Sequence, residues 1–192
     1  MKVILYAFLS VLLFNIHGCN STQTIPCAYI PQITETNQYP EITQYEDCAQ
    51  LDSNNNIVIT EKHMKQIWFD EAELAEIRVH DGIYYLNKQG KLVRSHKFDN
   101  GADYFKEGLS RIIQNDKFGF VNKKLEVVIP AKYDFAYPFN NGISKVCYGC
   151  KVVKVDEHKE MKGGKWGAID KAGNIKIEIS HDYDKLDEIK IN

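Results

Sequence analysis

One hairpin-like pattern recurs along the chain and constrains the fold more than any other feature of the sequence. In residues 115–129, NDKFGFVNKKLEVVI, a polar lead is followed by an aromatic residue, a glycine, alternating apolar residues, a polar turn and a second apolar run. Residues 164–177, GKWGAIDKAGNIKI, repeat this pattern, and residues 81–93, DGIYYLNKQGKLV, repeat it more weakly. Two short apolar runs around a polar turn are typical of a β-hairpin. Because internal recurrence indicates a repeat architecture, we expect an array of hairpins.

The residues that open the polar turns give the period of the repeat. The first and most degenerate copy lies in residues 51–60, LDSNNNIVIT, where an Asn-rich turn precedes a short apolar run. Successive turn openings are 35, 35 and 48 residues apart, so the last interval contains 13 additional residues. These lie between Val146 and Trp166, and insertions at the end of a hairpin often carry function. The turn-opening residues are Asp52, Asn87, Asn122 and Asp170.

Other local signals place the beginnings of individual elements. Phe105 and Phe139 each precede a glycine by three residues, and an alternating apolar run follows the glycine. This arrangement is typical of a tight bend that leads into a strand. After the first copy, apolar residues at helical spacing indicate one short helix before Phe69, with Thr60 at the position of its cap. A strand is then expected from about Leu74.

The N-terminal residues have the composition of an export signal. Lys2 supplies a positive charge, and residues 3–14, VILYAFLSVLLF, form an apolar run that is too short to span a membrane comfortably. The run leads to residues 16–19, IHGC, which resemble the bacterial lipobox. An ordinary signal peptide without a lipid is the alternative interpretation.

The lipobox resemblance implies a lipoprotein. It implies a signal helix in residues 1–18, cleavage before Cys19, and attachment of acyl chains, such as palmitate, to that cysteine. Asn20, in place of the Asp associated with retention in the inner membrane, favours an outer-membrane location. We therefore expect a tether with the first strands in residues 19–50 and the repeat domain in residues 51–192.

Apart from Cys19, the cysteines are even in number, which favours disulfides in an exported chain. Three pairings are possible, and the local one, Cys27 with Cys48 and Cys147 with Cys150, is preferred. The C-x-x-C spacing of the second pair leaves two alternatives open, a thiol–disulfide oxidoreductase and a metal-binding loop. A zinc ion would need two further ligands, and we expect neither a metal nor another cofactor.

Composition and the lack of known catalytic motifs exclude several classes of function. The formal net charge is −2, which gives no electrostatic reason to expect a nucleic-acid partner. Hydrophobic residues make up 44% of the chain and charged residues 26%, which argues for a globular fold. The histidines are scattered without an HExxH motif, and no serine lies in a nucleophile-elbow pattern. These observations favour a protein that is not an enzyme.

The repeat units resemble the WG repeat of bacterial proteins. Residues 166–173, WGAIDKAG, are similar to its central pattern of Trp-Gly, an aliphatic run, Asp and a later Gly. Residues 118–122, FGFVN, are similar with Phe for Trp and Asn for Asp, and residues 128–134, VIPAKYD, resemble the closing pattern. The resemblance is clear over residues 102–184 and weak over residues 51–100. The residues that carry the motif are Phe118, Gly119, Trp166, Gly167 and Asp170.

The resemblance implies a mainly β fold but no particular activity. One hairpin alone cannot bury its apolar face, so neighbouring hairpins are expected to stack, with the motif aromatic residues in the core. The array is expected to form a twisted sheet, a barrel-like wrap or a propeller-like arc. The family implies no catalytic residues for this chain. We therefore expect a lipid-anchored cell-envelope protein that binds another envelope protein or a cell-wall glycan.

Overall fold

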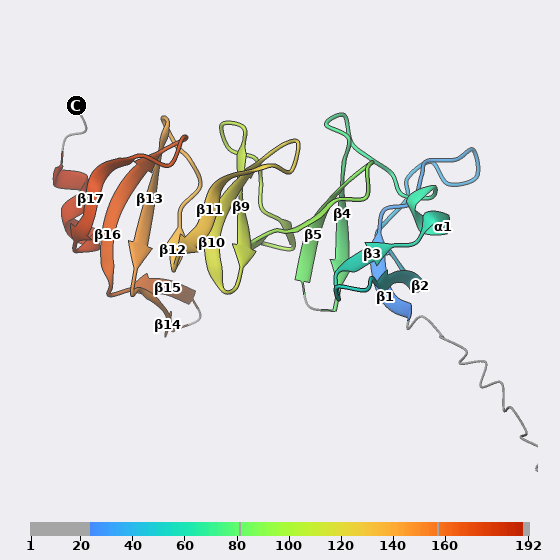
Figure 1. Cartoon of the computed structure of the whole chain (residues 1–192), viewed down its shortest axis with the longest axis horizontal. Helices are drawn as coiled ribbons and strands as arrows, with labels where there is room; N and C mark the ends of the chain where they lie inside the picture. The colour runs from blue at the N-terminus through green and yellow to red at the C-terminus, as the bar shows by residue number, and fades with distance from the viewer. Residues whose placement is uncertain (1–23, 81, 157, 190–192) are drawn as a thin grey trace, which may run out of the picture.

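The computed structural model describes residues 24–80, 82–156 and 158–189, in which most regular structure is β-strand. Figure 1 shows the strands in one row of small antiparallel sheets, which runs from β1 at one end of the molecule to β17 and the 3-10 helix η1 at the other. The predicted mainly β array of hairpins is therefore confirmed. The predicted signal helix and Cys19 lie outside the described residues. None of the helices in the described ranges has the length and apolar character needed to cross a bilayer.

The N-terminal end of the row is a six-stranded antiparallel sheet with the order β3-β2-β1-β4-β5-β6. Its core is built from alternate residues of the strands, and Tyr29, Ile67 and Ile77 are among the most deeply buried. The strand β1, from the segment expected to include the tether, lies inside the sheet, between β2 and β4. The strands are β1 (Thr24–Tyr29), β2 (Thr43–Leu51), β3 (Ile57–Ile59), β4 (Leu74–Val79), β5 (Gly82–Asn87) and β6 (Leu92–Arg94).

One short helix, α1 (Glu61–Met64), follows β3, and β4 begins at Leu74, as predicted. The predicted side-chain cap is wrong. Thr60 occupies the capping position with an extended backbone, but its hydroxyl makes no capping hydrogen bond. The Thr60 Oγ1 atom is buried without a hydrogen-bond partner among the described residues, so it faces the protein interior instead of the helix N-terminus. The backbone carbonyl of Thr60 accepts the first bonds of the helical turn, from the N–H groups of His63 and Met64.

The repeats that resemble the WG pattern form two further sheets. A three-stranded sheet has the order β11-β10-β9, and a four-stranded sheet has the order β12-β13-β16-β17. A small ladder, β7 (Lys97–Phe98) with β8 (Gly101–Ala102), lies between the first sheet and the second in the sequence. The strands of the two larger sheets are β9 (Leu109–Gln114), β10 (Lys117–Asn122), β11 (Val127–Tyr133), β12 (Phe135–Ala136), β13 (Ile143–Tyr148), β16 (Lys165–Asp170) and β17 (Ile175–His181).

The four predicted turn-opening residues build the same turn in every copy. Each side-chain oxygen accepts hydrogen bonds from the backbone N–H groups two and four positions later, at 2.8–3.1 Å. The residue three positions later has a positive φ in each copy. Asp and Asn suit the opening position because their short side chains reach the backbone of the following residues. The positive-φ residues are Asn55, Gly90, Leu125 and Gly173.

The motif glycines lie where the following strand passes closest to the backbone. The ladder between β10 and β11 shifts register between Phe118 and Phe120, and the ladder between β16 and β17 shifts between Trp166 and Ala168. At each shift the middle residue is glycine. A Cβ atom on Gly119 would lie 2.6 Å from the backbone nitrogen of Ala131, and one on Gly167 would lie 2.8 Å from the carbonyl group of Glu178. The glycine in the motif is therefore required by a close backbone approach at a bulge.

Replacing Gly167 with alanine should lower the free energy of unfolding by about 1–3 kcal/mol, because the backbone of β17 must move to make room. The matched control is Gly82→Ala. The three atoms nearest to a Cβ atom there all belong to the Arg94 side chain, the closest being Nε at 2.9 Å, and a side chain can move more easily than a strand. Urea denaturation of both variants measures the difference. A loss for Gly167→Ala that is no larger than the loss for Gly82→Ala would contradict the close-approach explanation.

The predicted insertion is a separate hairpin at the end of a repeat. Gln114 pairs with Lys117 across a two-residue turn, and the corresponding pair in the next unit is Tyr148 with Lys165. Residues 149–164 therefore replace that turn, which agrees with the predicted position of the insertion. They contain the antiparallel strands β14 (Lys151–Val155) and β15 (His158–Lys162), which lie below the ends of β13 and β16 in the view of Figure 1.

The C-terminal tail repeats the earlier unit, with an alignment that differs from a simple match of its letters. Tyr183-Asp184 matches Tyr133-Asp134 by letter, but the structure equates His181 with Tyr133. Trp166 pairs with His181 as Phe118 pairs with Tyr133. Likewise Lys165 binds Asp182 as Lys117 binds Asp134. The tail then forms η1 (Tyr183–Glu188), which packs against β16 and ends the row.

Candidate binding cleft

A half-open cleft lies beside the inserted hairpin, between β15 and the chain that follows β17. Its volume is about 870 Å³, which lies within the size range of small-ligand and peptide pockets. Residues from β12, β14, β15 and η1 contribute to its lining, and His96 reaches it from the link between β6 and β7. The cleft therefore forms where the insertion departs from the regular repeat.

Aromatic side chains form the floor of this cleft. Phe135, Tyr137 and Tyr183 line it, and the buried Trp166 packs behind them. The ring centroids of Trp166 and Tyr183 are 4.8 Å apart in an edge-to-face arrangement, and those of Phe135 and Tyr137 are 5.0 Å apart. Burial, and after it a hydrogen bond with Tyr183, raise the pKa of Tyr137 to about 12. Tyr137 therefore keeps its phenolic proton at neutral pH and offers both an apolar ring and a polar hydroxyl.

Charged groups stand on both sides of the cleft. The β15 side carries Lys159, Lys162 and Glu160, and the last two form an ion pair of 3.3 Å, whereas Asp182 and Asp184 come from the chain after β17. Asp182 forms an ion pair with Lys165 at 2.9 Å, and the hydrogen bond from this lysine holds the pKa of Asp182 below its usual range. Asp184 is exposed at the rim. The rim of the cleft therefore offers both cationic and anionic groups at neutral pH.

His96 adds a neutral group to the lining. Burial, and after it the positive charge of Arg111, lower the pKa of His96 to about 4. Its ring lies 5.0 Å from that of Phe118. The imidazole is therefore uncharged at physiological pH and does not add to the charged groups of the cleft.

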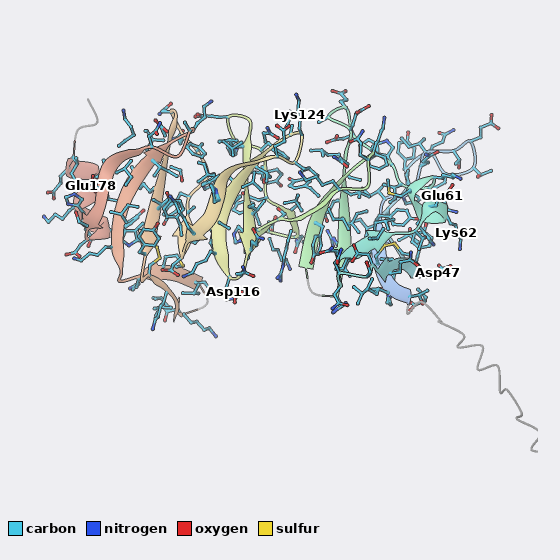
Figure 2. The ribbon with its side chains drawn as sticks, in the orientation of Figure 1. Asp47, Glu61, Lys62, Asp116, Lys124 and Glu178 are labelled. Carbon is cyan, nitrogen blue, oxygen red and sulfur yellow. A yellow bond between two sulfur atoms is a disulfide. The ribbon has the colours of Figure 1, made fainter. Side chains whose placement is uncertain are left out.

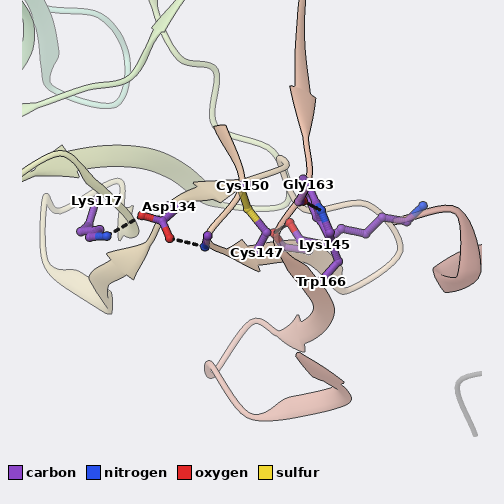
Figure 3. Close-up of a disulfide and its surroundings, with 9 residues drawn as sticks. Lys117, Asp134, Lys145, Cys147, Cys150, Gly163 and Trp166 are labelled. Carbon is purple, nitrogen blue, oxygen red and sulfur yellow. Dashed lines mark hydrogen bonds and ion pairs between the residues drawn. A yellow bond between two sulfur atoms is a disulfide. The ribbon is translucent and has the colours of Figure 1, made fainter. Parts of the chain in front are cut away.

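The base of the inserted hairpin is held at several points, which Figure 3 shows around the disulfide between Cys147 and Cys150. One carboxylate oxygen of Asp134 accepts the backbone N–H of Gly149 at 2.6 Å, and the other accepts the ammonium group of Lys117. These hydrogen bonds, first that of Lys117 and then that of Gly149, hold the pKa of Asp134 below its usual range. The hairpin is therefore attached to the neighbouring sheet as well as to its own.

Trp166 links the hairpin base to the floor of the cleft. Its indole Nε1–H donates a hydrogen bond of 2.9 Å to the carbonyl oxygen of Gly163, directly after β15. Gly164 follows with φ of +70°, and a Cβ atom there would overlap the backbone of residues 148–150. The two successive glycines thus allow the returning strand to pass against the start of the insertion.

The structure pairs the four described cysteines locally, as preferred from the sequence. Cys27 and Cys48 form one disulfide with a Cα–Cα distance of 5.5 Å, and Cys147 and Cys150 form the other with a distance of 6.2 Å. All four are buried. Buried disulfides do not favour the oxidoreductase or the metal-binding alternative, because both need accessible thiolates. Within the described ranges, no group of three or more His, Cys, Asp or Glu residues is arranged to hold a metal ion.

The motif residues predicted from the sequence do not gather into one site. Phe118 and Gly119 lie in β10, whereas Trp166, Gly167 and Asp170 lie in β16. Phe118 and Trp166 are buried, as expected for core residues, and both rings pack against Phe135 of the cleft floor. Sequence reasoning did not identify Tyr137 or Tyr183 as site residues. The sequence feature that could have identified them is their position, because each closely follows an aspartate that closes a repeat unit.

A second polar cluster lies at the other end of the row and was also missed. The hydroxyl of the buried Tyr29 is 2.7 Å from Nδ1 of the buried His63, whose Nε2 is 3.0 Å from a carboxylate oxygen of Asp47. Figure 2 shows Asp47 near Lys62 at the surface beside α1, and these two side chains form an ion pair of 2.9 Å. Burial raises the pKa of the Tyr29 hydroxyl. The cluster satisfies polar groups inside the N-terminal core.

The row of stacked hairpins with a cleft at an insertion defines a repeat-based β protein. Residues 85–118 and 118–149 each match the model of the WG containing repeat family. The chain therefore contains WG-type repeats, and the matched region ends where the insertion begins. No curated protein and no solved structure shows significant similarity to the chain.

Proposed function

We propose that this protein is a lipid-anchored cell-envelope protein whose hairpin array is an interaction module and whose contact site is the cleft beside β15. The observation that carries the proposal is the cleft itself, which joins an aromatic floor to a rim with both charges. Such a combination supplies apolar contact area together with orienting polar groups. The WG repeats supply the scaffold, since repeat arrays commonly present extended binding surfaces.

The lipobox resemblance of residues 16–19 supports the anchor, and Asn20 supports the outer membrane as its location. The partner is another envelope protein or a cell-wall glycan. Metabolic labelling with palmitate should mark the wild-type protein and leave Cys19→Ala unlabelled. Equal labelling of the two proteins would remove the anchor from the proposal.

The contact site is tested by photo-crosslinking in intact cell envelopes. A photoreactive amino acid at position 152, which lines the cleft, should capture a partner. The same amino acid at position 127 is the matched control, because Val152 and Val127 are both strand valines with similar exposures, 60% and 52%. Position 127 does not line the cleft. Equal capture at both positions, or capture at neither, would refute the cleft as the contact site.

A further inference from the structure

The free edge of β15 borders the cleft. In the described part of the chain, β15 pairs only with β14. The cleft meets four successive residues of this strand, 159–162. Successive side chains of a strand point to opposite faces of the sheet. A cleft that lay over one face would therefore be lined by only every second residue of the strand. The contact with successive residues therefore places the cleft along the strand edge, where backbone N–H and C=O groups have no partner strand. Val152 of β14, which pairs with Met161, extends the lining over one face of the hairpin.

The inserted hairpin has little of the packing that usually stabilises a sheet, although Met161 of β15 packs against the core around Trp166. All residues of β14 but the last are exposed, so neither face of this strand is covered. Val152 and Val153 are among the exposed apolar residues of the molecule. A two-stranded hairpin is marginally stable in water, and here the disulfide and the Asp134 contact hold only its base. A third strand on the free edge would extend the ladder and cover part of the apolar surface.

We propose that the cleft binds an extended polypeptide segment of a partner, which adds to β15 as a third strand. The inference rests on the proposed interaction function and specifies the ligand of the same cleft. Strand addition takes its affinity from main-chain hydrogen bonds and its specificity from the side chains at alternate positions.

The lining of the cleft specifies which segments fit. Alternate side chains of an added strand face the aromatic floor made by Phe135, Tyr137 and Tyr183, so these positions are apolar. Asp184 stands at the rim opposite β15, and a Lys or Arg of the segment is its complement. The ligand class is therefore an extended peptide with apolar residues at alternate positions and a basic residue that reaches Asp184.

Peptide display and amide exchange test this proposal with the full-length protein in detergent. The probe is a display library of seven-residue peptides. We expect the enriched peptides to show alternating apolar residues and a Lys or Arg. A saturating enriched peptide should slow amide hydrogen exchange in residues 159–162 by about tenfold or more, because new backbone hydrogen bonds protect the strand. Exchange in β11, which is also an edge strand, serves as the internal control and should not change.

Two further measurements separate strand addition from other modes of binding. Methylation of the backbone nitrogens of alternate peptide residues should abolish binding when the methylated N–H groups are the ones that face β15. Methylation of the other set of alternate residues should leave binding intact. Asp184→Asn should weaken binding of the basic peptides by about two- to fivefold, as expected for one exposed ion pair.

Three outcomes would overturn the proposal. The first is peptide binding without protection of β15. The second is equal binding of the two peptides that are methylated on one or the other set of alternate residues. The third is that no peptide is enriched while the photoreactive group at position 152 still captures a partner, in which case the interaction function stands without strand addition. Loss of capture at position 152 would instead count against the interaction function itself.

Discussion

Replacing Asp103 with alanine should lower the free energy of unfolding by about 3–5 kcal/mol, because it leaves the Arg111 guanidinium buried without its counter-ion. Both residues are buried, with side-chain exposures of 3% and 4%. The guanidinium donates to both carboxylate oxygens of Asp103, from Nε at 2.8 Å and from Nη2 at 2.7 Å. Urea denaturation at neutral pH measures the loss.

The size of this effect follows from the position of the pair in the row. Arg111 also donates from Nη1 to the backbone carbonyl oxygen of Ala136, at 3.0 Å, which connects β9 with β12 of the next sheet. The carbonyl oxygen of Asp103 accepts the hydroxyl groups of Tyr85 in β5 and Ser110 in β9. The pair therefore lies where the N-terminal sheet meets the two repeat sheets, and its loss weakens both junctions.

A double variant, Asp103→Leu with Arg111→Met, is the control. It removes both charges and fills part of the space, so it should recover much of the stability that Asp103→Ala loses. If the double variant is as unstable as the single variant, the main contribution of the network comes from its hydrogen bonds to the backbone and not from charge compensation.

Replacing Trp166 with alanine should lower the free energy of unfolding by about 3–5 kcal/mol, the range for a large buried aromatic side chain. Trp166 is only 1% exposed, and its ring contacts Phe135, Tyr137 and Tyr183. Removal of the indole leaves a cavity directly behind the floor of the cleft. The same variant should therefore also weaken capture by a photoreactive group at position 152.

The matched control is Trp166→Phe, because Phe118 occupies the equivalent position in the preceding unit and packs against Phe135 as Trp166 packs against Tyr183. We expect Trp166→Phe to lose less than about 2 kcal/mol, since phenylalanine keeps most of the apolar contact. Phenylalanine cannot donate the hydrogen bond to Gly163. A loss equal to that of Trp166→Ala would show that this bond, and not the aromatic packing, dominates.

The parts of the fold that depend on residues close in sequence were predicted well. The turn-opening residues and their period follow from bonds that span only a few positions, and Asn122 shows this with its own backbone contacts. The Cys147–Cys150 pairing and the position of the insertion are local in the same sense. The tail is offset by two residues from the match of its Tyr-Asp letters, because its alignment is set by the pairing register, which only the partner strand defines.

The candidate site was largely hidden from the sequence. Tyr137 and Tyr183 come from different units. They meet because β12, β13 and β16 lie side by side and because the chain after β17 packs against Trp166. The buried pair of Asp103 and Arg111 was missed for a similar reason, because its burial depends on the junction between sheets.

The sequence by itself determined that this chain is a series of β-hairpins with repeated Asp and Asn turns, motif glycines and an insertion after Val146. These features depend on short-range bonds and on side-chain alternation, which a linear pattern records. Only the tertiary structure decided that the strands divide into several sheets in one row, that the insertion stands apart from them, and that a cleft opens beside its free edge. The physical reason is that these features arise from packing between units, which depends on how neighbouring hairpins meet in space.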